Sequence, residues 1–90
     1  MTREDLTAAA ESLRTAAGDA STDETRERLE SQATQFSDLA DADRGPDHGK
    51  LARHEHILAE IADEEGGAVA NHVADALESI QSFRETLEGV

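Results

Sequence analysis

Residues 43–50 read DRGPDHGK and lead directly into LARHEHILAEIADEE at residues 51–65. The first string contains the single proline and the single lysine of the chain, and the two strings together hold three of its four histidines. Proline and its preceding residue do not continue a helix comfortably, whereas Asp47 is a favourable N-cap residue. We therefore expect one helix to end near residues 41–43 and the next to begin close to Asp47.

The segment that follows has the apolar spacing of a helix that faces a core. Leu51, His54, Leu58 and Ile61 recur close to every 3.5 residues, and Ile57 widens this face. Gly66 and Gly67 then interrupt the pattern, and keeping both inside a helix would cost about 2 kcal/mol relative to alanine. We expect a turn there, with a single long kinked helix as the alternative.

Outward from this centre, the remaining chain reads as three further helices. Thr2 can cap a first helix that Gly18 ends, and Ser21 with Glu24 matches a capping box that opens a second. Residues 22–28 of the second helix carry no large apolar residue, so we expect them to be solvated or to meet another subunit. The apolar stripes are Leu6, Ala9, Ala10, Leu13, Ala16 and Ala17; Leu29, Ala33, Phe36, Leu39 and Ala40; and Val69, Val73, Ala76, Leu77, Ile80, Phe83 and Leu87.

The predicted fold is an all-α, antiparallel bundle of four helices. Connections of a few residues favour antiparallel neighbours, and no alternating strand pattern is present in the sequence. No internal repeat or low-complexity linker divides the chain, so residues 1–90 are expected to form a single domain.

The charge is the most unusual property of the composition. Against 21 acidic residues there are 8 basic ones, which gives a formal net charge of -13, and only 16 of 90 residues are Leu, Ile, Val or Phe. Molar salt screens carboxylate repulsion and strengthens apolar burial, so this composition indicates a protein of a concentrated-salt environment. The alternatives are an acidic interaction tail and a mimic of nucleic acid, but the acids are spread along the chain.

Several classes of function are disfavoured. The sequence has no segment of ~18 apolar residues and no signal peptide, so we expect a cytoplasmic protein that does not enter a membrane. The absence of cysteine removes disulfides, thiolate metal sites and cysteine nucleophiles. Direct binding to a nucleic-acid backbone is not expected without a basic cluster, and no cofactor motif is present.

The candidates for a metal site are His54, His56 and Glu60. His56 and Glu60 are four residues apart, but His54 and His56 project about 200° apart on a helix, so the three do not share one face. We prefer a structural role for His54 in the apolar seam, where replacement by leucine should preserve stability. A metal-binding protein or a small enzyme is the alternative to a non-enzymatic chain.

Two groups of residues suggest contacts with partners. Arg44, His48, Lys50 and Arg53 form a local basic group that could receive an anion or a partner's carboxylate, or tie the loop to neighbouring helices. The first helix offers few large side chains, so we expect an apolar surface at Ile57, Val73, Leu77, Ile80 and Phe83 to form a twofold homodimer. Coverage by Leu6 and Leu13 within one chain is the competing account.

The composition, together with DRGPDHGKLARH at residues 43–54, resembles a family of small, uncharacterised acidic helical proteins of halophilic archaea. The resemblance extends over nearly the whole chain and implies a helical fold and a saline habitat, with no activity to carry over. The function therefore stays unknown at this level. The interpretation we favour is a non-enzymatic interaction or structural module that associates with itself, with a second protein as a further candidate partner.

Overall fold

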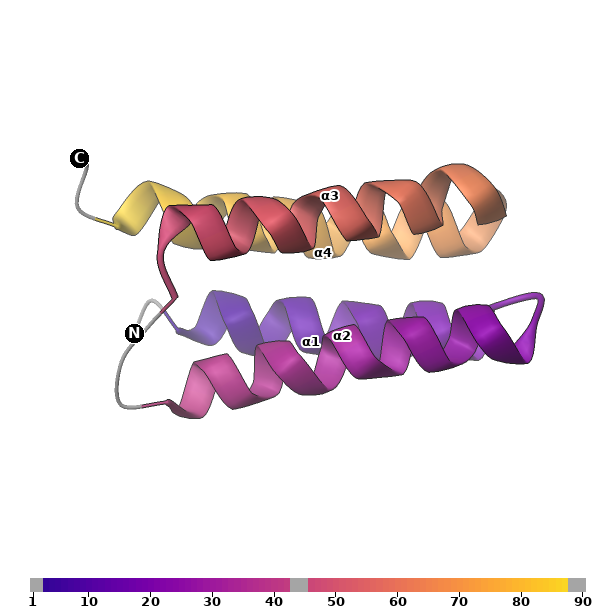
Figure 1. The fold of residues 1–90 in the computed structure, drawn as a ribbon, viewed down its shortest axis with the longest axis horizontal. Coiled ribbons are helices and arrows are strands. Elements are labelled where there is room, and N and C mark those ends of the chain that lie inside the picture. The colour runs from indigo at the N-terminus through magenta and orange to yellow at the C-terminus, as the bar shows by residue number, and fades with distance from the viewer. Residues whose placement is uncertain (1–2, 43–45, 88–90) are drawn as a thin grey trace.

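Four helices follow one another along residues 3–42 and 46–87, which are the parts of the chain that the computed structural model describes. They are α1 (Glu4–Gly18), α2 (Asp23–Asp41), α3 (His48–Glu65) and α4 (Gly67–Thr86). Each helix runs antiparallel to the one before it (Figure 1). The prediction of an all-α antiparallel bundle is confirmed.

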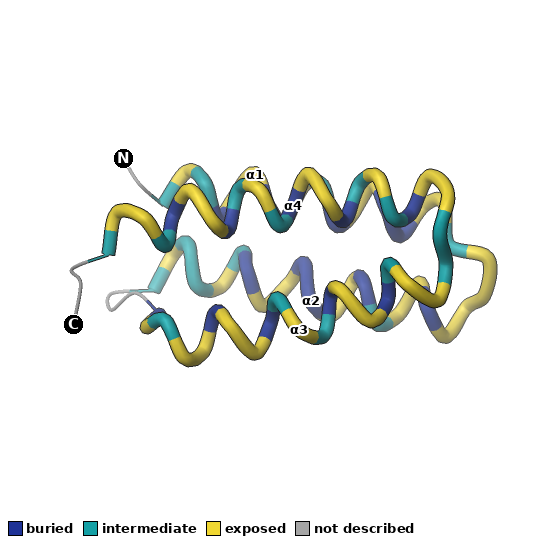
Figure 2. Tube along the Cα trace, turned by 90° about the horizontal axis from the view of Figure 1, so that it is seen from above, coloured by how far each residue is buried: buried dark blue, intermediate teal, exposed yellow. Residues whose placement is uncertain are grey.

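The helices do not pack equally closely around the bundle. α1 lies against both α2 and α4, and α3 lies against α4, whereas α2 and α3 make little close backbone contact. The alanines of α1 allow this close approach on two sides. Seen from above, α4 overlies α1 and α3 overlies α2, with buried positions turned towards the interior (Figure 2). The side of the bundle between α2 and α3 is therefore its most open side.

The core consists of the predicted apolar stripes. Leu6, Leu13, Phe36 and Ile80 are among the side chains with no exposed surface. α1 is packed more extensively than its few large residues suggested, because its six apolar positions are all buried between α2 and α4. The radius of gyration of 12.3 Å agrees with about 12 Å for a folded chain of this length.

One of the predicted helix caps is confirmed and one needs correction. Asp47 caps α3 as expected, since its carboxylate accepts a hydrogen bond of 2.8 Å from the backbone N–H of Lys50. The N-cap of α2 is Thr22, one residue after the predicted Ser21, and it accepts from the N–H of Thr25. Thr2 lies outside the described residues, and α1 begins after Arg3 without a side-chain cap.

The connection between α3 and α4 is a turn and not a kink. Gly66 alone separates the two helices, with φ 64° and ψ −166°, a conformation that is essentially restricted to glycine. The alternative of one long kinked helix is therefore excluded. None of the four helices, as far as they are described, combines the length and apolar character needed to cross a bilayer.

Candidate functional site

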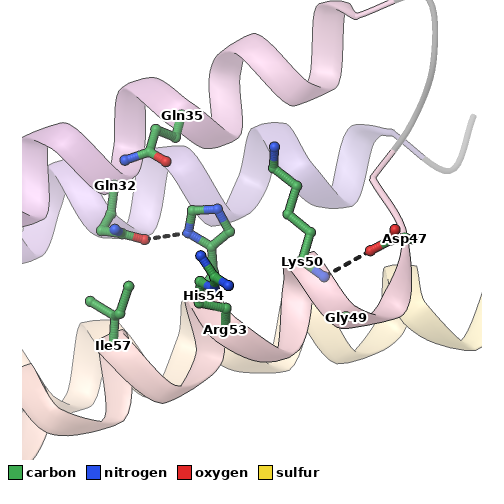
Figure 3. A pocket seen from close by; sticks show the side chains of 8 residues that line it. All are labelled: Gln32, Gln35, Asp47, Gly49, Lys50, Arg53, His54 and Ile57. Atoms are coloured by element: carbon green, nitrogen blue, oxygen red, sulfur yellow. Dashed lines mark hydrogen bonds between the residues drawn. The ribbon is translucent and has the colours of Figure 1, made fainter.

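An open groove of about 640 Å³ runs between α2 and α3 on the loosely packed side of the bundle (Figure 3). Its lining comes from both helices and from the cap of α3: Gln32, Gln35, Asp47, Gly49, Lys50, Arg53, His54 and Ile57. A second hollow of about 310 Å³ shares Gln32 and Ile57 with it. We refer to the two together as the α2–α3 groove, with Ile57 at its middle.

His54 forms the floor of the groove. The ring stands between α2 and α3 and is only 5% exposed, and its Nδ1 lies 2.6 Å from Oε1 of Gln32, which is 7% exposed (Figure 3). An amide oxygen accepts, so this contact places a proton on Nδ1. The ring also packs against Phe36 of α2, with centroids 4.8 Å apart. His54 thus joins α3 to α2 where their backbones are far apart, which supports its predicted structural role.

The environment of His54 favours the neutral imidazole. Burial lowers its pKa below the ordinary value of 6.5, and the nearby charges of Lys50 and Arg53 lower the pKa further. With the proton on Nδ1, the neutral imidazole leaves Nε2 as a hydrogen-bond acceptor. The only protein hydrogen bond of the ring within the described residues is the one to Gln32.

Lys50 and Arg53 give one end of the groove a positive charge. Both side chains are exposed, and within residues 3–42 and 46–87 neither has a carboxylate at ion-pair distance. Asp47 lies close by but uses one carboxylate oxygen to cap α3. The predicted basic group is therefore present in part, and we call Lys50 and Arg53 the cationic end of the groove.

The other members of the predicted basic group do not join this end. Arg44 lies outside the described residues. His48 accepts a hydrogen bond of 3.1 Å from Nε of Arg84, whose guanidinium also pairs with Glu55 at 2.8 Å. These half-buried contacts tie the start of α3 to the end of α4, so His48 has the structural role that was the alternative to anion binding.

The opposite end of the groove is acidic. Glu24 and Glu27 of α2 line the second hollow together with Arg28, Ser31, Gln32 and Ile57. Arg28 pairs with Glu64 of α3 at 3.4 Å, whereas Glu24 and Glu27 have no cationic partner in the described part of the chain. Most of residues 22–28 is exposed as expected, apart from Thr25, which is buried. We call Glu24 and Glu27 the acidic end of the groove.

The predicted metal candidates do not come together. His54 is buried against α2, while His56 and Glu60 form a solvent-exposed pair 3.3 Å apart, with 76% and 55% of their side chains exposed. Across the described ranges, no three His, Cys, Asp or Glu side chains are grouped so as to hold a metal ion. An isolated His–Glu pair on a helix surface is an ordinary i,i+4 contact and does not by itself make a metal-binding site.

The predicted apolar interaction surface needs correction. Val73, Ile80 and Phe83 are core residues of the single chain, with exposures of 0%, 0% and 3%. α1 packs against α4 and covers them, as the competing account held, so they cannot form an exposed patch. Leu77 and Ile57 remain partly exposed, and Ile57 lies in the α2–α3 groove.

Sequence reasoning missed two residues of the groove. Gln32 and Gln35 carry no motif and lie in a helix with few apolar residues. Their role depends on the separation of α2 from α3, which no local pattern in the sequence specifies. Gln32 is three residues after Leu29 and one before Ala33, which places it at the edge of the apolar stripe of α2. This position was the sign in the sequence that Gln32 lies close to the core.

Comparison with known proteins gives one match. A family model described as "Family of unknown function (DUF7553)" matches residues 1–86, which include all four helices. No curated protein and no solved structure matches the chain significantly. The match agrees with the predicted membership of an uncharacterised helical family, and it carries no activity, ligand or habitat.

Proposed function

We propose that this chain, which belongs to the family of unknown function DUF7553, is a small non-enzymatic bundle that acts as a protein interaction module and associates with a second copy of itself. The observation that carries the proposal is the α2–α3 groove. Three of the four sides of the bundle are closed by packed helices, while this side stays open. It leaves Ile57 partly exposed between charges that have no ion-pair partner among residues 3–42 and 46–87.

A non-enzymatic role is supported by how the titratable side chains are used. The buried histidine bonds to an amide, His48 bonds to an arginine, and His56 pairs with a glutamate at the surface. Each of these contacts has a structural explanation. A catalytic site would instead need a nucleophile, a base and an oriented partner to converge on one point.

We also propose a cytoplasm of high salt concentration as the working environment. The net charge of -13 supports this, because carboxylates that repel one another in dilute buffer are screened at molar ionic strength. Self-association of two such chains requires the same screening. Concentrated salt would also strengthen the apolar contact at Ile57.

Light scattering in molar KCl tests the proposed function. The chain has a mass of 9.6 kDa, and we expect the measured mass to rise towards twice this value as the protein concentration increases. A constant mass of one chain up to millimolar concentration would contradict self-association. The measurement should be repeated with excess EDTA, since a mass that depends on a contaminating metal would point to the metal-binding alternative.

A further inference from the structure

The α2–α3 groove carries opposite charges at its two ends. Lys50 and Arg53 are seven and four residues before Ile57 on α3, and at 1.5 Å per residue they lie about 10 and 6 Å from it along the helix axis. α2 runs antiparallel to α3, so Glu24 and Glu27 lie beyond Ile57 in the other direction. The groove is thus positive at one end, has the apolar side chain of Ile57 beside Gln32 at its middle, and is negative at the other end, where Arg28 is paired with Glu64.

This order is self-complementary. We propose that the α2–α3 groove is the surface on which a second copy of the chain docks, about a twofold axis that crosses the groove at Ile57. The axis places each cationic end on the acidic end of the partner and brings the two Ile57 side chains together. This proposal rests on the proposed self-association of the chain. It adds which surface forms the dimer interface and where the twofold axis lies.

The charge state of the two ends supports a copy of this chain as the occupant. Lys50 and Arg53 are exposed cations without a described carboxylate partner, although the chain has 21 acidic residues and 8 basic ones. Opposite charges that meet across an interface fix its register and suppress other orientations, which favours one specific dimer of two negative chains.

A twofold arrangement also explains why both ends are needed. In an isologous interface, a residue that contacts another on the partner is contacted by the same residue in return. One twofold axis therefore produces two matched charge contacts on either side of one apolar contact. An unrelated acidic partner would use the cationic end alone, and Glu24 and Glu27 would then repel it.

Charge reversal tests the pairing of the two ends. The variants are Lys50→Glu/Arg53→Glu, which reverses the cationic end, and Glu24→Lys/Glu27→Lys, which reverses the acidic end. All four side chains are exposed, so both variants should fold. Each variant alone should dimerise about tenfold or more weakly than the parent, because like charges then meet at both contacts. An equimolar mixture should form a heterodimer with roughly the affinity of the parent.

The control changes the net charge by the same amount as Lys50→Glu/Arg53→Glu, but elsewhere on the molecule. Arg14→Glu/Arg26→Glu alters two exposed arginines that do not line the groove, and it should leave dimerisation within about threefold of the parent. All measurements belong at the lowest KCl concentration at which circular dichroism shows every variant fully helical. Higher salt would screen the contacts that the variants are meant to change.

A disulfide tests the position of the axis. The chain has no cysteine, so Ile57→Cys introduces a single thiol where the axis is proposed, and mild oxidation should link two copies through residue 57. Glu78→Cys, on the exposed side of α4, is the matched control and should cross-link much more slowly.

Three results are distinguishable. Loss of dimer in both reversed variants, recovery in their mixture and rapid cross-linking at residue 57 would establish the groove as the interface. A parent dimer that both reversed variants retain, with no preference for Ile57→Cys over Glu78→Cys, would overturn this surface and leave self-association standing. A parent that is monomeric at all concentrations would overturn both.

Discussion

His54 shows how one polar side chain can replace backbone packing between two helices. It bonds to Gln32 and packs against Phe36 with the two rings tilted by 57°, both partners being on α2, at the place where the α2 and α3 backbones are not in close contact. A leucine at this position would not simply extend the apolar seam, because Gln32 is itself buried and would lose its partner. The structure therefore changes the expectation that leucine preserves stability.

A double-mutant cycle measures this pair. His54→Leu and Gln32→Leu should each lower the free energy of unfolding by about 1–3 kcal/mol, since each leaves a buried polar group unsatisfied. The double variant should lose less than the sum of the two, because neither polar group remains. Denaturant titrations in molar KCl provide the values, with the exposed His56→Leu as a control that should change stability by less than about 0.5 kcal/mol. Simple additivity would argue against a stabilising contact.

The lowered pKa of His54 predicts a dependence of stability on pH. In the folded state the pKa of His54 lies below its ordinary value of 6.5. At any pH between the folded-state pKa and 6.5, the unfolded chain therefore binds more protons than the folded chain. The contribution of the neutral His54 ring to stability is therefore fully present above pH 6.5, and it is lost as the pH falls through the lowered pKa. The parent should therefore lose stability between pH 7.5 and 5.5 relative to the variant His54→Leu/Gln32→Leu, in which the other titrations cancel. An NMR titration of the ring with a pKa at or above 6.5 would contradict this.

At the scale of elements, the ends of α3 show how single residues set chain direction. Asp47 caps one end through the Lys50 N–H, and at the other end the chain reverses at Gly66 and Gly67, which both have positive φ. Two hydrogen bonds also join the last residue of α3 to the connection between α1 and α2: the hydroxyl and the N–H of Ser21 both donate to the carboxylate of Glu65. These bonds lower the pKa of the Glu65 carboxyl group. The predicted capping residue Ser21 is thus used between helices.

Substitution of Gly66 tests the requirement for this turn. Gly66→Ala should lower the free energy of unfolding by about 1–3 kcal/mol, because φ 64° with ψ −166° is strained for any residue that has a Cβ atom. Gly18 is the matched control, since it ends α1 without a positive φ and an added Cβ would meet nothing within 4 Å. Gly18→Ala should be neutral or stabilising by up to about 1 kcal/mol. Equal melting temperatures for the two variants would argue against the tight turn.

Helix positions followed from the sequence, while helix neighbours did not. Periodic apolar residues and the caps predicted four helices, because these depend on contacts within one or two turns. The dimer surface was placed wrongly at Val73, Ile80 and Phe83 because a stripe of large residues looks the same whether a helix of the same chain or of another chain covers it. The alanines of α1 allow this helix to pack closely against α4, so a helix of the same chain covers these three residues.

At the scale of the whole molecule, the open side follows from an uneven distribution of side-chain size. Small residues bring α1 against two neighbours. Between α2 and α3, the long polar side chains of Gln32, Gln35, Lys50 and Arg53 line an open groove instead of closing it. Spacing along the sequence identified Lys50 and Arg53 as a basic group. The acidic residues on the other end of the same groove could be recognised only once the two helices were placed side by side.

The balance between the charge and the core predicts that folding depends on salt. A net charge of -13 opposes compaction in dilute buffer, and six of the 17 apolar residues that are buried in the described part of the chain are alanines, which bury little surface. Circular dichroism should therefore show helix content rising between low salt and molar KCl, where the Debye length falls to about 3 Å. Sucrose separates the two causes, because it strengthens apolar burial without screening charge. KCl should raise helicity at concentrations where sucrose does not, if repulsion between carboxylates is the main obstacle to folding. Full and cooperative helicity in salt-free buffer would show that the core alone outweighs that repulsion, and the proposed saline environment would then lose its main support.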